Sequence, residues 1–265
     1  MSYGEFVLVT GASSGIGLAA ARFFAERGCT VYAMSRHCKE ETVRTGDGCI
    51  VSVCGDVTDS ASLERVFSKI EKLNVVIHCA GFGISGSAEC TPVDAARAQM
   101  ETNYIGVLNV NSFALPLLRK NSHSVVIITS SVAGIIPIPF QSHYSSSKYA
   151  IEAYGEALRM ECRPYGVKVC LVEPGDTKTG FTAARTHNEP ENSPYFAKCT
   201  EAVQKMAEDE MKGASPEKVA SVFWKQAHKR NPKVRVAVGV QYKILAFISR
   251  ICPSKLKQLI LSKLY

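Results

Sequence analysis

Tyr144 and Lys148 stand four positions apart, and their types and spacing suggest catalysis of proton transfer. In a helix this spacing places both side chains on one face. A phenol with its ordinary pKa of about 10 is a poor acid or base at neutral pH. A neighbouring ammonium group stabilises the phenolate, so we expect Lys148 to lower the pKa of Tyr144 toward a useful range. The same spacing also arises in amphipathic surface helices, so this interpretation depends on the surrounding residues.

Two further polar residues support a catalytic site around the tyrosine. Ser131 lies thirteen positions before Tyr144, just after an apolar run. Its hydroxyl could hydrogen-bond a substrate carbonyl and the alkoxide formed from it. The spacing favours Ser131 over the neighbouring Ser130. Asn103 interrupts a helical pattern that extends over residues 92–119.

A glycine-rich turn near the N-terminus predicts a nucleotide site. It lies between a strand pattern and a helix pattern, where Gly11 permits a tight turn, Gly15 lets the backbone approach a pyrophosphate and Gly17 lets the helix pack on the strand. The helix N-terminus adds unpaired N–H groups and the positive end of its dipole. A purely structural turn is the alternative. Cofactor contacts are expected from Gly11, Ser13, Ser14, Gly15, Ile16 and Gly17.

Arg36 ends the second expected strand, nineteen positions after Gly17. Sites for NAD usually place an acidic residue here to bind the ribose 2′-hydroxyl. Arg36 would instead bind a 2′-phosphate bidentately, and no carboxylate is present to repel it. The sequence therefore predicts NADP(H) in preference to NAD(H), with a solvated surface arginine as the alternative. Together with Tyr144, this predicts hydride transfer between the cofactor and a secondary alcohol or ketone.

Alternating strand and helix patterns must position these residues. We expect helices over residues 15–27, 60–72, 92–119 with a break near Asn103, 143–163 and 216–229. Continuous apolar strands between helices predict a parallel sheet covered on both faces. The fold class is a doubly wound, Rossmann-type, three-layer α/β/α domain over residues 1–265. The expected strands are Phe6–Val9, Thr30–Met34, Cys49–Cys54, Val75–Ile77, Val125–Ile128, Val167–Val172 and Val234–Val238.

The amino-acid composition supports a single α/β domain. The chain has 265 residues, 46% hydrophobic and 21% charged, as one large globular α/β domain requires. Lys and Arg exceed Asp and Glu by 7, but there is no basic stripe or recognisable nucleic-acid module, so we do not expect nucleic-acid binding. The ten cysteines form no C-x-x-C pair, which predicts reduced thiols in a cytoplasmic protein and no metal site.

Neither end of the chain resembles a targeting or membrane-spanning segment. The residues before the first apolar run, Met1–Glu5, include no basic residue, and the run Phe6–Thr10 leads directly into the glycine turn. We therefore expect a strand there and no signal peptide. No stretch approaches the roughly 20 apolar residues of a membrane span.

Two segments stand apart from the alternating pattern. Residues 176–215 are polar and follow the sixth strand, so we expect them beyond the strand C-termini, where ligands bind in such sheets, as a substrate loop. Residues 239–265 are apolar and basic and are expected to be helical. This C-terminal segment suits peripheral membrane contact, a cap over the pocket or a subunit interface, and the sequence leaves these three alternatives open.

The order and spacing of these motifs resemble the short-chain dehydrogenase/reductase family over nearly the whole chain. The resemblance implies that Tyr144 is the general acid in reduction, that Lys148 also holds the nicotinamide ribose, and that Ser131 orients the carbonyl. It further implies that Asn103 seats a water behind Lys148 and that the chain forms a homodimer or homotetramer. Besides the residues above, it implies cofactor contacts from Asp56, Val57, Ala80, Gly81, Pro174, Gly175, Thr177 and Thr179.

The sequence departs from the family pattern in places. The family usually has Asn-Asn-Ala-Gly where this chain has His78-Cys79-Ala80-Gly81, so Cys79 must leave some backbone groups to other partners. Thr177 stands where an apolar β-branched residue is common. An epimerase or dehydratase of this fold would have a longer chain and another glycine pattern, and a binding protein without catalysis would lack the tyrosine or the lysine.

Apolar residues near the catalytic segments predict the substrate class. An apolar mouth with few polar anchors suits a lipophilic ketone or alcohol. The chain is similar to hydroxysteroid and retinol dehydrogenases, so we predict a steroid-like substrate, with a retinoid or acyl ketone as the alternative. His143 is expected to be exposed at a helix start, and Phe223 and Trp224 to be core residues. The expected mouth consists of Phe82, Ile84, Ile135, Ile136, Pro137, Ile138, Pro139 and Phe140.

Overall fold

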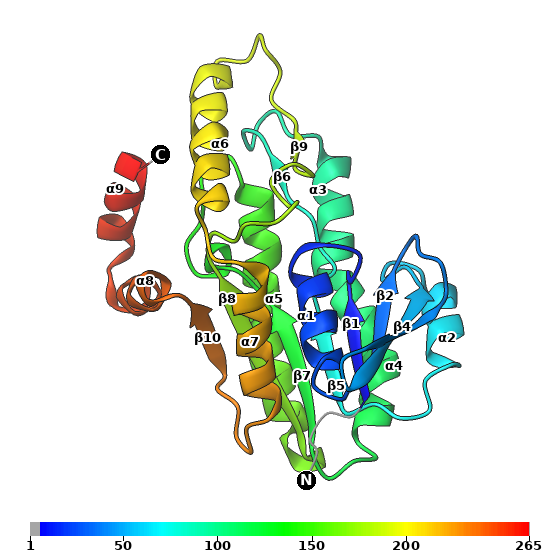
Figure 1. Ribbon diagram of the computed structural model, residues 1–265. Coiled ribbons are helices and arrows are strands. Elements are labelled where there is room, and N and C mark those ends of the chain that lie inside the picture. Colours follow the sequence, from blue (N-terminus) through cyan, green and yellow to red (C-terminus); the bar gives the residue numbers. More distant parts are fainter. Residues whose placement is uncertain (1–5, 265) are drawn as a thin grey trace.

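Alternate residues of the central strands face opposite sides of one sheet, and both sides are buried. In a computed structural model that describes residues 6–264, Val7 and Val9 of the first strand pack into one core and Leu8 packs into the other. The period of two follows from the pleat of the strand. Two apolar faces must each be covered, which is why helices lie on both sides (Figure 1).

The sheet has eight strands in the order β10-β8-β7-β5-β1-β2-β4-β3. All neighbours are parallel except β3, which runs antiparallel to β4. The strands are β1 (Phe6–Thr10), β2 (Thr30–Ser35), β3 (Thr42–Thr45), β4 (Gly48–Cys54), β5 (Val75–His78), β7 (Ser124–Thr129), β8 (Val167–Pro174) and β10 (Arg235–Val238).

Helices form the outer two layers. α1 (Gly15–Ala25) and α7 (Pro216–Ala227) pack together on one face, where Phe24 meets Trp224 edge to face with 5.1 Å between ring centres. α2 (Ser60–Phe67), α4 (Gly106–Leu118) and α5 (Ser142–Cys162) cover the other face. The predicted three-layer α/β/α class is confirmed, and Phe223 and Trp224 contribute to the core as expected.

The seven expected strands all form, within one or two residues of their predicted bounds. β3 was not predicted, because it is an exposed hairpin strand without alternating polarity, turned at Gly46 with φ +58°. Three helices end at least two residues earlier than predicted, and one of them is α7, which ends at Ala227 and not at residue 229. α1 stops two residues before Arg27, and Gly28 then takes a positive φ of +88°. After α2 the chain continues only as a turn through residues 68–70.

The helical pattern over residues 92–119 is broken where the sequence indicated. α3 (Val93–Met100) passes into a π-helix, Glu101–Ile105, before α4 begins at Gly106. Asn103 lies inside this π-helical turn, which widens the backbone at the catalytic end of the sheet. Such π-helical turns are rare and frequently mark functional sites.

The two segments that stood apart in sequence have regular structure. Residues 176–215 contain β9 (Thr186–His187), which pairs with β6 (Ile84–Ser85), and the long helix α6 (Phe196–Met211). The C-terminal segment forms α8 (Val240–Ile251), which contacts β10, and α9 (Ser254–Leu264), which follows α8 at the same side of the molecule (Figure 1). Met1–Glu5 and Tyr265, parts of the expected N-terminal and C-terminal segments, lie outside the described residues.

Two features bear on membrane and redox chemistry. Among residues 6–264, no helix combines the length and the apolar character needed to cross a bilayer. All ten cysteines are free thiols.

The substitution of His78-Cys79 for the family's Asn-Asn pair is accommodated by neighbours. The hydroxyl of Thr10 accepts hydrogen bonds from the backbone N–H groups of Cys79 and Ala80, both at 3.1 Å. The buried ring of His78 lies with Nε2 3.0 Å from Oδ1 of Asn111. Burial lowers the pKa of His78 from 6.5 to about 4.

The lowered pKa of His78 predicts acid-sensitive stability. Above pH 6.5 the ring is neutral in both states, but between pH 6.5 and about 4 the unfolded chain binds the proton first. The shift corresponds to about 3 kcal/mol of unfolding free energy lost across that window. We expect His78→Asn, which cannot titrate there, to lose less stability than the native chain in urea unfolding between about pH 7 and about pH 4.5. Equal losses in the two proteins would contradict this assignment.

Candidate active site

The carboxyl ends of the central strands open into one cavity of about 650 Å³. In parallel sheets, ligands bind at this edge where the strand order reverses, which here is between β1 and β5. Every predicted site residue except Asn103 lines this cavity. The sequence could not show that these separate motifs meet in one place. These residues are Gly11, Ser13, Ser14, Gly15, Ile16, Gly17, Arg36, Asp56, Val57, Ala80, Gly81, Ser131, Tyr144, Lys148, Pro174, Gly175, Thr177 and Thr179.

The glycine turn fits a dinucleotide pyrophosphate. A Cβ atom at Gly11, whose φ is +66°, would lie 2.7 Å from the backbone of Ala80, and one at Gly17 would lie 2.3 Å from the carbonyl oxygen of Gly11. Ser14 caps α1 without a side-chain hydrogen bond to the helix. The first N–H groups of α1 are therefore available to a phosphate beside a backbone that no larger residue could form.

The far end of the cavity presents groups suited to an adenosine. Arg36 is exposed at the rim, directly after β2. The carboxylate of Asp56 is oriented by Thr58, whose N–H and hydroxyl donate to its Oδ1 at 2.9 and 2.8 Å. Within the described residues, the other carboxylate oxygen of Asp56 has no hydrogen-bond partner. This end of the cavity thus presents a guanidinium and a carboxylate, and the glycine turn lines the same cavity.

The loop after β8 closes over the glycine turn. Gly15 takes a φ of +53°, and a Cβ there would lie 3.4 Å from the side chain of Thr179. The hydroxyl of Thr177 donates to the carbonyl of Gly175 at 2.9 Å, so the threonine that departs from the family pattern is satisfied locally. These contacts set the width of the cofactor cleft.

Asn103 braces the site from behind and does not line the cavity. Its buried side chain accepts from the N–H of Phe82 and donates to the carbonyl of Phe82, each at 3.0 Å. It also donates to the hydroxyl of Ser147 at 3.1 Å. Asn103 therefore ties the loop after β5 to α5, one residue from Lys148.

Lys148 is buried, and its ammonium group donates to the carbonyl of Thr129 at 2.9 Å. The nitrogen lies 5.8 Å from the ring centre of Tyr144. Burial lowers the pKa of Lys148 from 10.5 to about 8. At neutral pH the side chain still keeps its charge, although its pKa of about 8 lies much closer to neutral pH than the usual value.

The expectation that Lys148 lowers the pKa of Tyr144 is wrong for this structure. Burial raises the pKa of the phenol to about 12, opposed by a hydrogen bond from Ser131. The carboxylate of Glu210 raises this pKa further and Arg185 lowers it. Because the ammonium of Lys148 is directed at Thr129, desolvation outweighs its effect on the phenol.

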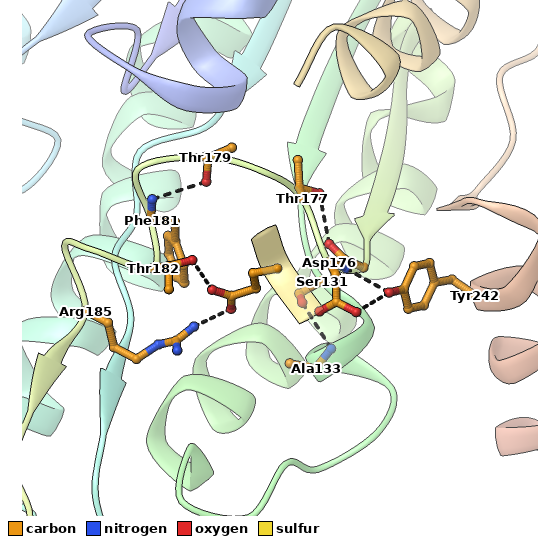
Figure 2. Close-up of polar contacts among 11 residues, drawn as sticks. Ser131, Ala133, Asp176, Thr177, Thr179, Phe181, Thr182, Arg185 and Tyr242 are labelled. Carbon is orange, nitrogen blue, oxygen red and sulfur yellow. Dashed lines mark hydrogen bonds and ion pairs between the residues drawn. The ribbon is translucent and has the colours of Figure 1, made fainter. Parts of the chain in front are cut away.

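Ser131, and not Ser130, faces the phenol, as the spacing favoured. Its hydroxyl also accepts from the N–H of Ala133 at 3.1 Å, which caps a short 3-10 turn, Val132–Gly134 (Figure 2). Ser130 is fully buried beneath it. The cap fixes the direction in which the Ser131 oxygen points.

The expected apolar mouth is largely wrong. Only Phe82 and Ile138 of its eight residues line the cavity, since Ile84 and Ile136 are buried in the core and Pro137 and Pro139 face solvent. These residues are close to the catalytic segments in sequence, but turns around Phe140, whose φ is +59°, direct them elsewhere. His143 was expected to be exposed, but it is half-buried and its Nε2 atom is enclosed. It does not line the cavity.

The substrate side is instead formed by residues that sequence analysis did not single out. The ring of Phe181 packs against the ring of Tyr144, with 5.6 Å between the ring centres. Ala184 and Glu210 also line the cavity. Thr182 and Arg185 both hydrogen-bond the carboxylate of Glu210 (Figure 2). No local motif marks them, because Glu210 lies at the end of α6, which returns to the carboxyl ends of the strands only in the folded chain (Figure 1).

The C-terminal segment is fastened to the rim of the site. The hydroxyl of Tyr242 in α8 hydrogen-bonds the carboxylate of Asp176 and accepts from its N–H at 3.0 Å (Figure 2). Ser249 donates to the carbonyl of Ile135 at 2.9 Å, and Arg250 lies 3.8 Å from Glu173. The segment thus contacts the loops that frame the cavity.

A glycine turn before a helix, a buried lysine and a phenol with a neighbouring hydroxyl fit a dinucleotide-dependent oxidoreductase. The family model for short chain dehydrogenases matches residues 5–190. The chain belongs to the short-chain dehydrogenase/reductase family. It is therefore an NAD(P)-dependent enzyme acting on alcohol or ketone groups.

Similar proteins cover almost the whole chain. A 3-ketodihydrosphingosine reductase of Bacteroides thetaiotaomicron is 35% identical, over 91% of this chain and 90% of its own. An NADPH-dependent 3-dehydrocapnine reductase of Ornithobacterium rhinotracheale is 30% identical, over 89% and 88%. A short-chain dehydrogenase structure from Streptomyces avermitilis has a TM-score of 0.80 at 25% identity, covering 92% of each chain.

Proposed function

We propose that this enzyme uses NADPH to reduce the keto group of a lipophilic, long-chain substrate. The observation that carries the proposal is that Tyr144, Ser131 and Lys148 meet on the wall of the cavity that the glycine turn also lines. Two relatives are named as reductases of 3-ketodihydrosphingosine and 3-dehydrocapnine, which favours a long-chain ketone over the steroid-like or retinoid substrate expected earlier.

The chemistry assigns one task to each side chain. The bound nicotinamide supplies the hydride. Ser131 donates to the carbonyl oxygen, and Tyr144 gives its proton to the alkoxide that forms. A pKa of about 12 keeps the phenol protonated at neutral pH, so it is poised as a donor, in the direction of reduction. Lys148 would hold the cofactor ribose, and Asn103, which donates to Ser147 of α5, would seat a water behind Lys148.

Residues 176–215 form the substrate side in this proposal. They contribute Thr177, Thr179, Phe181, Ala184 and Glu210 to the cavity wall. In this proposal, the predicted cofactor-binding residues that line the cavity hold the cofactor.

Tyr144→Phe tests the proton donor. We expect turnover of a long-chain ketone to fall by roughly 100-fold or more, because the alkoxide loses its acid, while NADPH affinity stays nearly unchanged. NADPH absorbance and fluorescence measure the two quantities. Tyr149→Phe, an exposed tyrosine of α5, is the matched control.

A panel of substrates accompanies this variant, namely a long-chain ketone, a steroid ketone, retinal and a small polar ketone. Turnover that survives in Tyr144→Phe contradicts the assigned donor. Reduction of the small polar ketone alone contradicts the substrate class.

Arg36 underlies the proposed preference for NADP(H). It lines the exposed end of the cavity, where a 2′-phosphate of the adenosine would lie, and a planar guanidinium binds phosphate bidentately. We expect Arg36→Ala to raise the KM for NADPH by roughly 10- to 100-fold, the worth of a charged hydrogen bond, with little change for NADH. Arg44→Ala, an exposed arginine on β3, should alter neither. A wild-type enzyme that uses NADH equally well would overturn the preference.

The C-terminal segment supports peripheral contact with an anionic membrane. Val240, Ile244, Phe247 and Ile251 form one exposed stripe along α8, with Phe247 64% and Ile251 67% exposed. Residues 239–265 contain five Lys or Arg and no Asp or Glu, so they carry most of the net charge of +7. Since Tyr242 fastens α8 to the cavity rim, this contact would place the cavity beside the lipid.

Sedimentation with vesicles tests this contact. We expect the enzyme to co-sediment with anionic phosphatidylserine vesicles, to bind neutral phosphatidylcholine vesicles less, and to be released by about 1 M salt. A Phe247→Glu, Ile251→Glu variant should lose binding. The control is Val43→Glu, Val93→Glu, which alters exposed apolar residues outside the C-terminal segment and the proposed subunit interface. Equal sedimentation of both variants would exclude the C-terminal segment as the contact.

Two further features complete the proposal. The ten free thiols favour a reducing compartment such as the cytoplasm.

We also propose a homodimer or homotetramer through α4 and α5, where Met160 and Tyr149 of α5 are exposed. Light scattering would then give a multiple of the 28.8 kDa chain mass.

A further inference from the structure

The substrate part of the cavity contains one carboxylate that the chemistry above does not use. Three acidic residues line the cavity among the described residues. Asp56 lies at the adenosine end, and Asp176 is engaged by Tyr242. Glu210 is the third, and it lies with Phe181 and Tyr144 on the substrate wall.

The carboxylate of Glu210 is held firmly but not saturated. One oxygen accepts from the guanidinium of Arg185 and the other from the hydroxyl of Thr182. The Arg185 side chain is 3% exposed and the Glu210 side chain 17%. Two carboxylate oxygens offer about four acceptor sites, so two of them remain for a donor in the cavity.

The carboxylate of Glu210 faces the cavity, and the guanidinium of Arg185 does not. Glu210 is a lining residue, whereas Arg185 lies behind it against Phe181. The effect of Glu210 on the pKa of the Tyr144 phenol also exceeds the opposing effect of Arg185, so the pair acts on the phenol as a net negative charge. The negative side of a buried ion pair, facing the cavity beside Phe181 and Tyr144, favours a cationic ligand group.

We propose that Glu210 binds a protonated amine of the substrate, so that the preferred substrates are long-chain ketones with an amine beside the carbonyl. Thr182 and Arg185 act as positioning residues that hold the carboxylate in place. This inference rests on the proposed reduction of a long-chain ketone.

The placement has a consequence for the proton donor. An ammonium group between Glu210 and Tyr144 would offset the negative charge that raises the pKa of the phenol. The amine would then assist transfer of the phenolic proton to the alkoxide. A ketone without the amine lacks this assistance and also loses the ionic contact.

The test compares Glu210→Gln with the native enzyme on two substrates, a long-chain α-amino ketone and the same ketone without the amine. The substitution keeps an acceptor for Thr182 and removes the charge. We expect kcat/KM for the amino ketone to fall by roughly 10- to 100-fold, the worth of a charged hydrogen bond, and to change by less than about threefold for the plain ketone. Glu208→Gln, an exposed position of the same helix, should change neither.

The two substrates separate the possible failures. Retained turnover of the plain ketone shows that the variant is folded. An equal loss on both substrates would mean that Glu210 only fastens the loop to α6, and this overturns the inference. Equal kcat/KM of the native enzyme for both ketones overturns it as well, while the proposed reduction of long-chain ketones stands. If the native enzyme reduces neither ketone, both proposals fail.

A second variant guards against destabilisation by the unpaired Arg185. In Glu210→Gln with Arg185→Met, the buried guanidinium charge is removed together with its partner. We expect this double variant to show the same selective loss on the amino ketone. Restored preference for the amino ketone in the double variant would contradict a role for the carboxylate.

Discussion

The close approach of the β1 and β5 loops is the constraint on which the rest of the site depends. Gly11 lies so near Ala80 that a side chain would collide with the backbone, and the Thr10 hydroxyl satisfies the N–H groups of Cys79 and Ala80. This contact brings two strand ends together where the order of strands reverses. It lies beside the cavity, and it provides hydrogen bonds for the N–H groups of Cys79 and Ala80 where the family usually has asparagine before Ala80.

Burial, and not pairwise attraction, dominates the electrostatics of the active site. The pKa of Tyr144 rises and that of Lys148 falls for the same reason, since each charged form is desolvated. The ammonium group of Lys148 gains its compensation from the Thr129 carbonyl. The site therefore holds a protonated phenol next to a lysine that remains charged at neutral pH, an arrangement suited to giving a proton to an alkoxide.

Segments distant in sequence complete the substrate side. α6 brings Glu210 back over the cavity, and α8 contributes Tyr242, which fills the space beside Gly175. Residues 176–215 thus contribute to the cavity wall, and α8 of the basic, apolar C-terminal segment contacts its rim.

The sequence alone determined the fold class and the strand positions, and it predicted the residues that line the cavity, because each rests on local periodicity or on a motif of fixed spacing. The break at Asn103 and the choice of Ser131 over Ser130 were predictable for the same reason. The pKa of Tyr144, the position of His143 and the lining of the substrate wall were not, because they depend on burial and on which distant residues fold over the cavity. Phe181 and Glu210 belong to no motif, and only the tertiary structure placed them against Tyr144, since that contact arises from the packing of α6 and not from spacing along the chain.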